Sequence, residues 1–267
     1  MATQFTDPNY LKTGQYRDSS NLDARAVIHQ RFSTNPYGWF NWVFDALNKL
    51  PGNAKILELG CGPAYLWKAR IERIPSGWNV TLSDLSPGMV DAAWRNLVVT
   101  GRNFKFEETD AQSIPYSNGT FDAVIANHML YHVPDRKKAL TEIRRALKAD
   151  GRLFATTVGD HHLKEISAWL SRATNKNDLA RFTQPFLLEN GLGQLQEFFA
   201  KVELSRYDDN LRVTEVEPIM AYIRSGIRAV NFSETEMAKI EKELCEQLER
   251  DGEIFITKDS GMFEAQK

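Results

Sequence analysis

The sequence predicts an α/β fold in which helices cover both faces of a mostly parallel sheet. Three observations support this prediction. Strand and helix patterns alternate up to residue 158, as parallel strands joined by helical crossovers require. The apolar strand 56–59 runs into a glycine-rich turn. Polar side chains follow each of the first four strands, and ligands of open α/β sheets bind where the carboxyl ends of the strands meet.

The elements of this alternating part are placed from local signals. Four further strands are expected at 79–84, 104–109, 121–126 and 152–158. Ser86-Pro87 and Thr34-Asn35-Pro36 each combine an N-cap residue with proline at the first helical position, so each predicts a helix start. Another helix is expected over 135–148, because one of its faces is apolar.

The regular alternation ends after residue 158. Helical patterns occupy about 160–172, 178–200 and 215–250. Strand patterns separate them at 202–207 and 253–258. No internal repeat and no break in composition marks an independent unit, so we expect a single domain over 1–267.

The composition is typical of a soluble enzyme. The chain has 267 residues, a formal net charge of −2 and 42% hydrophobic residues, enough for one large domain. Its two cysteines cannot form a disulfide framework, and no apolar run reaches the roughly 18 residues of a membrane span. No signal peptide is seen, so a cytoplasmic protein without a membrane partner is expected. The mildly acidic balance gives no electrostatic footprint for nucleic acid.

The glycine-rich turn Gly60-Cys61-Gly62 is preceded by a carboxylate, Glu58. Such a turn lets the backbone approach a nucleotide-like ligand closely, and dinucleotide sites add a third glycine, where this chain has Tyr65. A pyrophosphate at the helix N-terminus would also lie near the anionic Glu58. S-adenosylmethionine carries an ammonium and a sulfonium and no phosphate. The turn therefore favours this cationic ligand over a nicotinamide dinucleotide.

The ends of the next three strands supply further candidate ligand contacts. Asp84 follows the glycines by roughly 20 residues, the distance at which a carboxylate accepts the hydroxyls of a ribose. Asp110 is placed to accept from an adenine amino group. Asn127 and His128 reach the same edge from the fourth strand.

Several of these assignments have structural alternatives. Asp84 could cap the helix that begins at Pro87, and Asp110 could simply start a turn. Met89 could belong to the core instead of contacting the adenine. Cys61 is expected to be a small buried residue of the turn and not a nucleophile.

The chain resembles the class I S-adenosylmethionine-dependent methyltransferases, in particular the small-molecule branch similar to the ubiquinone and menaquinone biosynthesis enzymes. The resemblance covers roughly residues 51–158 and is looser beyond them. Many members have a glycine where this chain has Ala64. The motifs that carry the resemblance are Glu58-Leu-Gly-Cys-Gly-Pro-Ala64, Asp84-Leu-Ser-Pro-Gly-Met89, Asp110-Ala111 and Asn127-His-Met-Leu-Tyr-His-Val-Pro-Asp135.

The resemblance implies a Rossmann-like seven-stranded sheet with helices on both faces, a helical cap and an antiparallel last strand pair, 202–207 and 253–258. The implied cofactor is S-adenosyl-L-methionine, with S-adenosyl-L-homocysteine as its product. The expected segments are an N-terminal helical cap at 1–50, a cofactor-binding core at 51–158, cap insertions at 159–200 and 215–250, and last strands within 201–214 and 251–267. The implied cofactor contacts are Glu58, Gly60, Cys61, Gly62, Asp84, Leu85, Met89, Asp110, Ala111 and Asn127.

Catalytic candidates lie just after the fourth strand. His128, Tyr131 and His132 could each act as a general base, and His128 leads because an imidazole ordinarily titrates near neutral pH. A hydroxyl or acidic carbon acceptor would need such a base, whereas a thiolate or amine would not. The acceptor and its reacting atom (O, C, N or S) therefore stay open.

Two further hypotheses concern a metal site and a partner for the methionine carboxylate. A metal site is not expected: one built from the four histidines His128, His132, His161 and His162 is disfavoured, because no aspartate or cysteine stands at ligand spacing. The aromatic-rich N-terminal segment is expected to close over the cofactor. One of its arginines, Arg17, Arg25 or Arg31, could pair with the methionine carboxylate.

Three other functions compete with small-molecule methyl transfer. A nucleic-acid methyltransferase would share the sheet, but Asn127-His-Met-Leu130 replaces the Asn/Asp-Pro-Pro-aromatic motif of enzymes that methylate base amino groups. A nicotinamide oxidoreductase is disfavoured by Glu58 and Tyr65. A non-catalytic protein that binds or senses S-adenosylmethionine stays open, because a motif indicates binding and not turnover. The expected partner is a small-molecule acceptor, and the oligomeric state is open.

Overall fold

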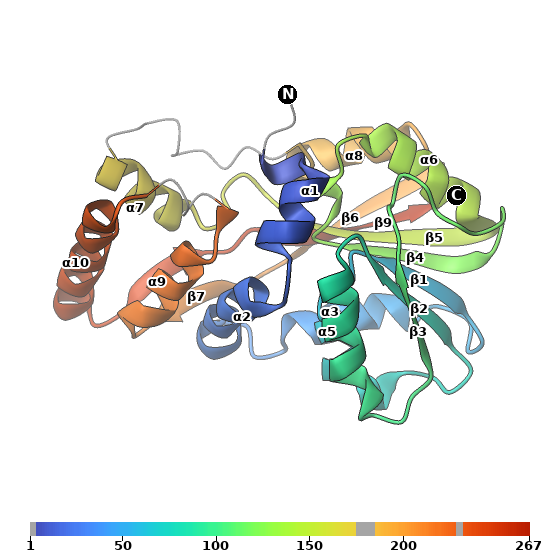
Figure 1. Cartoon of the computed structure of the whole chain (residues 1–267), viewed down its shortest axis with the longest axis horizontal. Coiled ribbons are helices and arrows are strands. Elements are labelled where there is room, and N and C mark those ends of the chain that lie inside the picture. Colours follow the sequence, from blue (N-terminus) through green and yellow to red (C-terminus); the bar gives the residue numbers. More distant parts are fainter. Residues whose placement is uncertain (1–3, 175–184, 228–231) are drawn as a thin grey trace.

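The computed structural model describes residues 4–174, 185–227 and 232–267. Its centre is a seven-stranded sheet in the order β3-β2-β1-β4-β5-β9-β6 (Figure 1). The first five of these strands are parallel, and β9 runs antiparallel to both β5 and β6. This confirms the predicted fold class. The strands are β1 (Lys55–Leu59), β2 (Asn79–Asp84), β3 (Phe104–Glu108), β4 (Phe121–Asn127), β5 (Leu147–Val158), β6 (Lys201–Tyr207) and β9 (Ser260–Gln266).

The register of the central strands brings the predicted site residues to one edge. Strand β1 is buried from its second residue to its last, as expected for a strand covered on both faces. Leu59 pairs with Ser83, so the glycine turn that follows β1 begins beside Asp84 at the end of β2. Glu58 pairs with Ile125, two residues before the end of β4. The carboxyl ends of these strands therefore meet.

Two hydrophobic clusters cover the two faces of the sheet. One face packs against α3 (Trp39–Leu47), α4 (Tyr65–Ala69) and α5 (Pro87–Val98). The other packs against α6 (Arg136–Ala146) and α8 (Leu188–Gln196). The predicted start of α5 is confirmed, because the Ser86 side chain caps the Met89 amide and Pro87 occupies the first turn.

Two predictions about individual elements are wrong: the pairing of the strand at 253–258 and the start of α3. The pattern at 253–258 forms β8 (Ile254–Thr257), which pairs with β7 (Asn210–Val213) in a separate two-stranded sheet. The antiparallel partner of β6 is β9, a strand of low β propensity that is fixed by burial of its side chains. Helix α3 begins only at Trp39, because Thr34 and Asn35 donate to Asp209 and do not start a helix.

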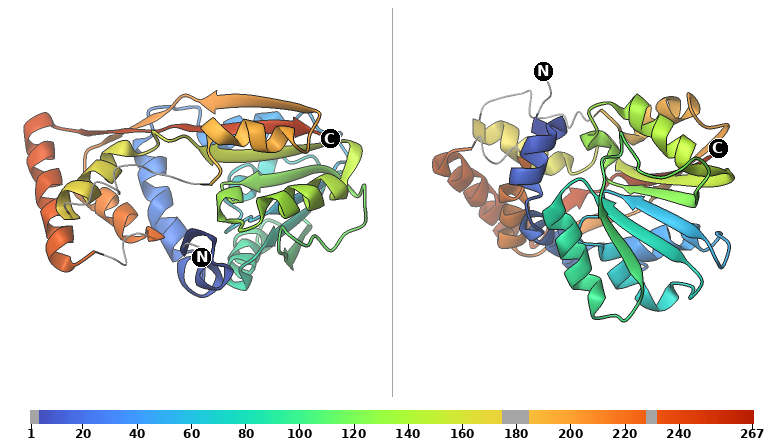
Figure 2. Two further views of the ribbon diagram at one scale, coloured as in Figure 1. Left: turned by 90° about the horizontal axis from the view of Figure 1, so that it is seen from above. Right: turned by 45° about the vertical axis from the view of Figure 1, so that its right-hand side comes forward.

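A cap with its own hydrophobic cluster lies beyond the sheet (Figure 2). It contains α2 (Ser20–Phe32), α7 (Lys164–Thr174), α9 (Val216–Arg224), α10 (Glu234–Asp251) and the small β7–β8 sheet. The short helix α1 (Pro8–Tyr10) and its neighbouring turns, residues 4–15, precede α2. The predicted helix at 178–200 lies partly outside the described residues, and its described part is α8.

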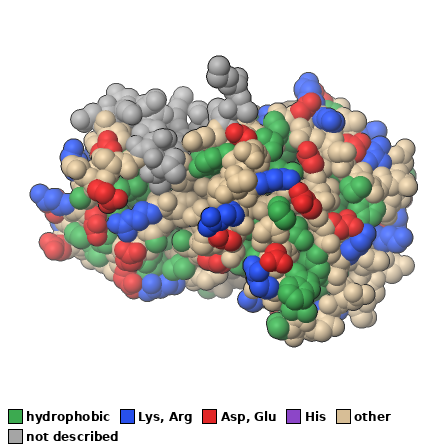
Figure 3. Space-filling model, viewed as in Figure 1, with side chains coloured by type: hydrophobic (Ala, Val, Ile, Leu, Met, Phe, Trp, Pro, Cys, Tyr) green, Lys and Arg blue, Asp and Glu red, His purple; other side chains and the backbone are tan. Residues whose placement is uncertain are grey.

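The surface carries mixed charge. On the face in Figure 3, lysines and arginines are interspersed with acidic side chains, and hydrophobic side chains gather over α5, where Trp94 and Val98 are exposed. A continuous basic stripe, the usual mark of nucleic-acid binding, is not seen on this face. None of the helices in the described part of the chain has both the length and the apolarity needed to cross a membrane.

Candidate active site

The turn between β1 and α4 adopts a backbone that residues with side chains rarely take. Gly60 and Gly62 have φ values of 66° and 52°, and Ala64 has a φ of 59°. A side chain on Gly60 would meet Met129 at 2.7 Å, so only glycine fits there. Ala64 tolerates the left-handed conformation at a cost of roughly 1–2 kcal/mol. The turn brings the backbone of residues 60–64 to the strand edge, where the cofactor is expected.

Glu58 is buried at the end of β1, with 2% of its surface exposed. Its carboxylate accepts from the indole of Trp67 and, at 2.8 Å, from Nδ2 of Asn127. Burial raises the pKa of Glu58 to about 7, and the hydrogen bonds from Trp67 and Asn127 act in the opposite direction. A cation placed beside Glu58 would compensate this buried charge.

Asp84 links the glycine turn to the start of α5. One carboxylate oxygen accepts from the Gly62 amide at 2.9 Å, and the other accepts from the Ser86 amide at 2.8 Å. Ser86, and not Asp84, caps α5, so the alternative that Asp84 is the helix cap is wrong. Burial raises the pKa of Asp84, while three backbone amides act to lower it. The ribose contact of Asp84 stays a prediction.

The remaining cofactor candidates are less distinctive. Gln112 donates to both oxygens of Asp110 from its side chain and to one from its backbone, so Asp110 does start a turn. Met89 is buried. Burial also raises the pKa of the Cys61 thiol, so this thiol stays neutral. Beside Asp110, the hydroxyl of Thr109 is buried without a hydrogen-bond partner. The sequence analysis missed Thr109, because an isolated threonine at a strand end gives no signal.

The N-terminal segment lies over this edge of the sheet. The Tyr16 carbonyl accepts from the Ser86 hydroxyl at 2.6 Å. The backbone of Arg17, the next residue, packs against the first turn of α5. A Cβ on Gly88 would lie only 1.8 Å from the Arg17 carbonyl oxygen. Further along, a Cβ on Gly62 would contact Leu22 at 3.4 Å. Residues 15–25 therefore cover the glycine turn and the first turn of α5.

His132 is held by two residues of this N-terminal segment. Its Nε2 lies 2.8 Å from the Tyr16 hydroxyl, and its Nδ1 lies 2.7 Å from the Phe5 carbonyl oxygen. A carbonyl can only accept, so Nδ1 carries the proton and Nε2 accepts from Tyr16. Burial lowers the pKa of His132 to about 4. The imidazole is therefore neutral at pH 7, and its tautomer is fixed.

His128 occupies a different environment from His132. It follows β4 with a φ of 49°, its amide donates to Thr156, and its ring lies 5.4 Å from that of Trp39. The two histidines therefore do not share a helix face. Burial lowers the pKa of His128 to about 4, so the expectation that it titrates near neutral pH is wrong. Thr156 also donates to Asn127, a positioning role that the sequence analysis missed.

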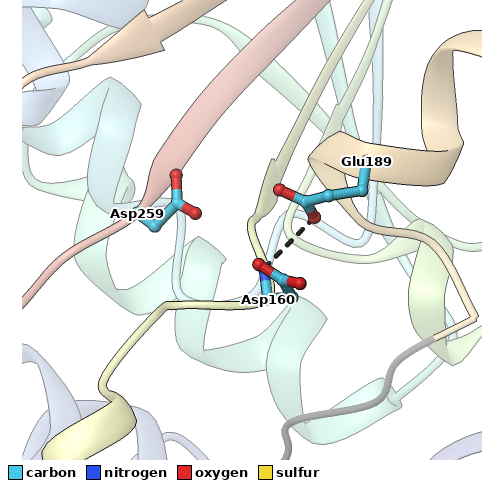
Figure 4. A group of neighbouring side chains, drawn as sticks. All are labelled: Asp160, Glu189 and Asp259. Atoms are coloured by element: carbon cyan, nitrogen blue, oxygen red, sulfur yellow. Dashed lines mark hydrogen bonds between the residues drawn. The ribbon is translucent and has the colours of Figure 1, made fainter.

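One group of potential metal ligands comes together within the described residues: Asp160, Glu189 and Asp259, with ligand atoms within 4.8 Å of one another (Figure 4). Arg206 forms ion pairs with Glu189 and Asp259, and the Asp160 amide donates to Glu189 at 3.1 Å. Arg206 thus compensates part of the negative charge, and we assign no metal to this group. His162 does not join it as a ligand, because its Nδ1 accepts from the Asp259 amide.

The sheet order, the glycine turn after β1 and the carboxylate at the end of β2 define the Rossmann-like methyltransferase fold, and solved structures share it. The [4+2]-cyclase SpnF superposes with a TM-score of 0.62 at 19% identity, over 97% of this chain and 96% of that one. YcgJ from Bacillus subtilis gives 0.59 at 15% identity, over 85% and 97%. A phosphoethanolamine N-methyltransferase 2 from Haemonchus contortus, in complex with S-adenosyl-L-methionine, gives 0.59 at 19% identity, over 100% and 60%.

Residues 57–155 match the family described as a methyltransferase domain, which confirms the resemblance to S-adenosylmethionine-dependent methyltransferases. A malonyl-[acyl-carrier protein] O-methyltransferase from Legionella pneumophila is 31% identical over 43% of this chain and 40% of its own. A ubiquinone biosynthesis O-methyltransferase from Idiomarina loihiensis is 29% identical over 61% and 62%. A demethylmenaquinone methyltransferase from Thermus thermophilus is 37% identical over 40% and 48%. The match thus spans about two fifths to three fifths of these relatives.

Proposed function

We propose that the protein transfers a methyl group from S-adenosylmethionine to a small-molecule acceptor. The observation that carries this proposal is the pair of carboxylates on either side of the glycine turn, the buried Glu58 and the partly buried Asp84. A buried carboxylate needs a compensating partner, and the cofactor offers an ammonium, a sulfonium and two ribose hydroxyls. The unpartnered hydroxyl of Thr109 adds a hydrogen-bonding group at the expected adenine end.

The chemistry supplied by the bound cofactor is an electrophilic methyl group. The chain then has to hold the acceptor in line with the carbon–sulfur bond and to exclude water, and such positioning contributes roughly 7–11 kcal/mol. Residues 15–25 supply the cover that excludes water. For a protic acceptor, the Tyr16–His132 pair is the best candidate for receiving the proton, because His132 is neutral and its Nε2 already accepts from a hydroxyl. His128 and Tyr131 remain the other candidates.

The second candidate function is non-catalytic binding of S-adenosylmethionine. The same fold occurs in a protein described as a [4+2]-cyclase, so the fold alone does not require methyl transfer. The surface in Figure 3 does not support a nucleic-acid substrate, because acidic side chains interrupt the basic ones.

Calorimetry tests the cofactor, and transfer of a labelled methyl group tests the reaction. S-adenosylmethionine and S-adenosylhomocysteine should bind, and NAD should bind much more weakly, because a phosphate would face Glu58. Acceptors from several classes (phenols, carboxylic acids, amines and thiols) are then offered with labelled cofactor. Tight binding of NAD without binding of S-adenosylmethionine would contradict the proposal. Cofactor binding without transfer to any acceptor or to retained small molecules would favour the non-catalytic function.

Cofactor affinity should depend on pH through Glu58. In the free protein this carboxyl is protonated below a pKa of about 7, and a bound cation favours its ionised form. Affinity should therefore be full above pH 7 and fall as the pH decreases through 7, by about tenfold between pH 8 and pH 6. Calorimetry in buffers of different ionisation enthalpy measures both the affinity and the proton released. The matched control is Glu58→Gln, whose affinity should not change over this range. An equal affinity of the wild-type protein at both pH values would refute the role of Glu58.

The N-terminal cover should be weakened by Gly88→Ala, since the new Cβ cannot fit against the Arg17 carbonyl. Alanine favours the helix more than glycine does, so α5 itself should persist. We expect faster hydrogen exchange over residues 4–25 and weaker cofactor binding. In the wild-type protein, exchange there should slow when cofactor binds. Gly193→Ala in α8 is the control, because no atom lies within 4 Å of its added Cβ. Equal exchange over 4–25 in both variants would show that this contact does not hold the cover.

A further inference from the structure

We propose that the inner face of α2 binds an oxyanion of the acceptor, a carboxylate or a phosphate group, through Arg25 and His29. The proposal rests on the function proposed above and names the class of acceptor: a small acid. Two buried polar atoms without partners, one on each residue, carry it.

Arg25 and His29 are four residues apart on α2, so they lie on the same face of the helix. The His29 ring lies 5.8 Å from that of Tyr222, which belongs to α9. The Arg25 guanidinium carbon lies 5.7 Å from the centre of the Tyr16 ring. The face that bears both side chains is therefore turned toward the interior of the molecule, between the cap and the N-terminal segment.

Each of the two side chains has a polar atom that is buried and makes no hydrogen bond: Nη2 of Arg25 and Nδ1 of His29. Arg25 donates through Nε to the Asn21 carbonyl at 3.1 Å and interacts with the Tyr16 hydroxyl, whereas its Nη2 has no partner. An unmade hydrogen bond at a buried group costs about 1–3 kcal/mol, and more at a charged one. Two such atoms one turn apart are better explained by a ligand than by two unrelated packing faults.

The surroundings of Arg25 contain no described carboxylate that pairs with it. By contrast, Arg31 on the same helix pairs with Glu215, and the buried Lys258 pairs with Asp209. The groups that interact electrostatically with Arg25 are neutral phenols and imidazoles. These are Tyr16, His29, Tyr65, Tyr131, His132 and Tyr222. Tyr16 and His132 already use their hydrogens in the bonds described above. The donors left for an oxyanion are therefore the Arg25 guanidinium, which has no carboxylate partner, and the His29 imidazole when Nδ1 carries its proton.

The two residues differ in their distance from the glycine turn: Arg25 is one helical turn after Leu22 and interacts electrostatically with Tyr65, whereas His29 lies further along α2. Leu22 lies against Gly62, and Asp23 accepts from Tyr65, so the first turn of α2 covers the cofactor end. His29 is two turns further on, next to His162, whose ring centre lies 6.4 Å away. Seven residues of helix span about 10 Å. Because the proposed anion reaches His29 as well as Arg25, we assign it to the acceptor and not to the methionine part of the cofactor.

The test compares wild-type protein, Arg25→Gln and Arg31→Gln, the last as a control on the same helix. Acetate and phosphate are the probes, and they are titrated by calorimetry at constant ionic strength, with and without S-adenosylhomocysteine. We expect at least one probe to bind wild-type protein and Arg31→Gln, and to bind Arg25→Gln at least tenfold more weakly. Circular dichroism checks that each variant is folded. His29→Gln should weaken probe binding less than Arg25→Gln does, because the imidazole of His29 is neutral. Absence of probe binding, or equal binding by wild type and Arg25→Gln, would overturn the proposal.

A second arm identifies the source of the anion. S-adenosylhomocysteine carries a carboxylate, whereas 5′-methylthioadenosine lacks the amino-acid part. The proposal expects both to bind Arg25→Gln as they bind wild type. If Arg25→Gln binds S-adenosylhomocysteine more weakly than wild type does but binds 5′-methylthioadenosine equally well, Arg25 binds the cofactor carboxylate and the acceptor assignment is wrong. If neither nucleoside binds wild-type protein, the proposed function fails, while the probe titrations without nucleoside still report on Arg25.

Discussion

Lys258→Met is expected to lower the free energy of unfolding by about 3–5 kcal/mol, because it leaves the buried charge of Asp209 without its cation. The side chains of Lys258 and Asp209 are 8% and 1% exposed and form an ion pair. Asp209 also accepts from the Ser33 hydroxyl at 2.8 Å and from the amides of Thr34 and Asn35 at 3.0 Å. This network joins the connection between α2 and α3 to the β7–β8 sheet. Urea unfolding measures the loss.

An exposed ion pair provides the matched control. Arg95 and Asp91 lie one turn apart on α5, with 57% and 63% of their side chains exposed, so Arg95→Met should cost less than about 1 kcal/mol. The double variant Asp209→Asn with Lys258→Met should recover part of the loss, because no buried charge is then left unpaired. A loss in Lys258→Met no larger than in Arg95→Met would mean that Asp209 is sufficiently stabilised by its backbone and hydroxyl donors.

Asp84→Ala is expected to weaken binding of S-adenosylhomocysteine by about 1.5–3 kcal/mol, the range for hydrogen bonds to a charged group. The structure adds a second contribution to this effect, because Asp84 also holds the Gly62 amide at 2.9 Å and so shapes the turn. Calorimetry measures the affinity, and circular dichroism checks that the fold is kept. Ser86→Ala is the control for loss of the α5 cap alone.

A cofactor analogue separates the two contributions of Asp84. S-adenosylhomocysteine without its two ribose hydroxyls cannot receive the proposed hydrogen bonds. The wild-type protein should bind it more weakly, and Asp84→Ala should add less to that loss than it does with the complete cofactor. If Asp84→Ala weakens the binding of S-adenosylhomocysteine and of the analogue equally, Asp84 acts only by shaping the glycine turn.

The first five strands of the sheet were predictable from the sequence because their signals are local. A buried parallel strand reads as an apolar run, and the proline-marked start of α5 follows Ser86 directly in the chain. The same reasoning failed at the last sheet strand. The segment Ile254–Thr257 has the stronger strand pattern, yet it pairs in the cap, while the weaker segment Ser260–Gln266 completes the sheet. Tertiary burial outweighed propensity there.

The sequence by itself determined the glycine turn, the carboxylates at the strand ends and thereby the type of ligand, since each depends on residues adjacent in the chain. Only the tertiary structure decided which groups meet across the chain. Tyr16 and His132 are 116 residues apart, and no periodicity relates them. Their contact, and the burial that lowers the pKa of His132 to about 4, arise because the N-terminal segment folds over the sheet edge. The same packing leaves Nη2 of Arg25 buried without a hydrogen bond. The order of residues does not specify which neighbours desolvate a side chain or pair with it.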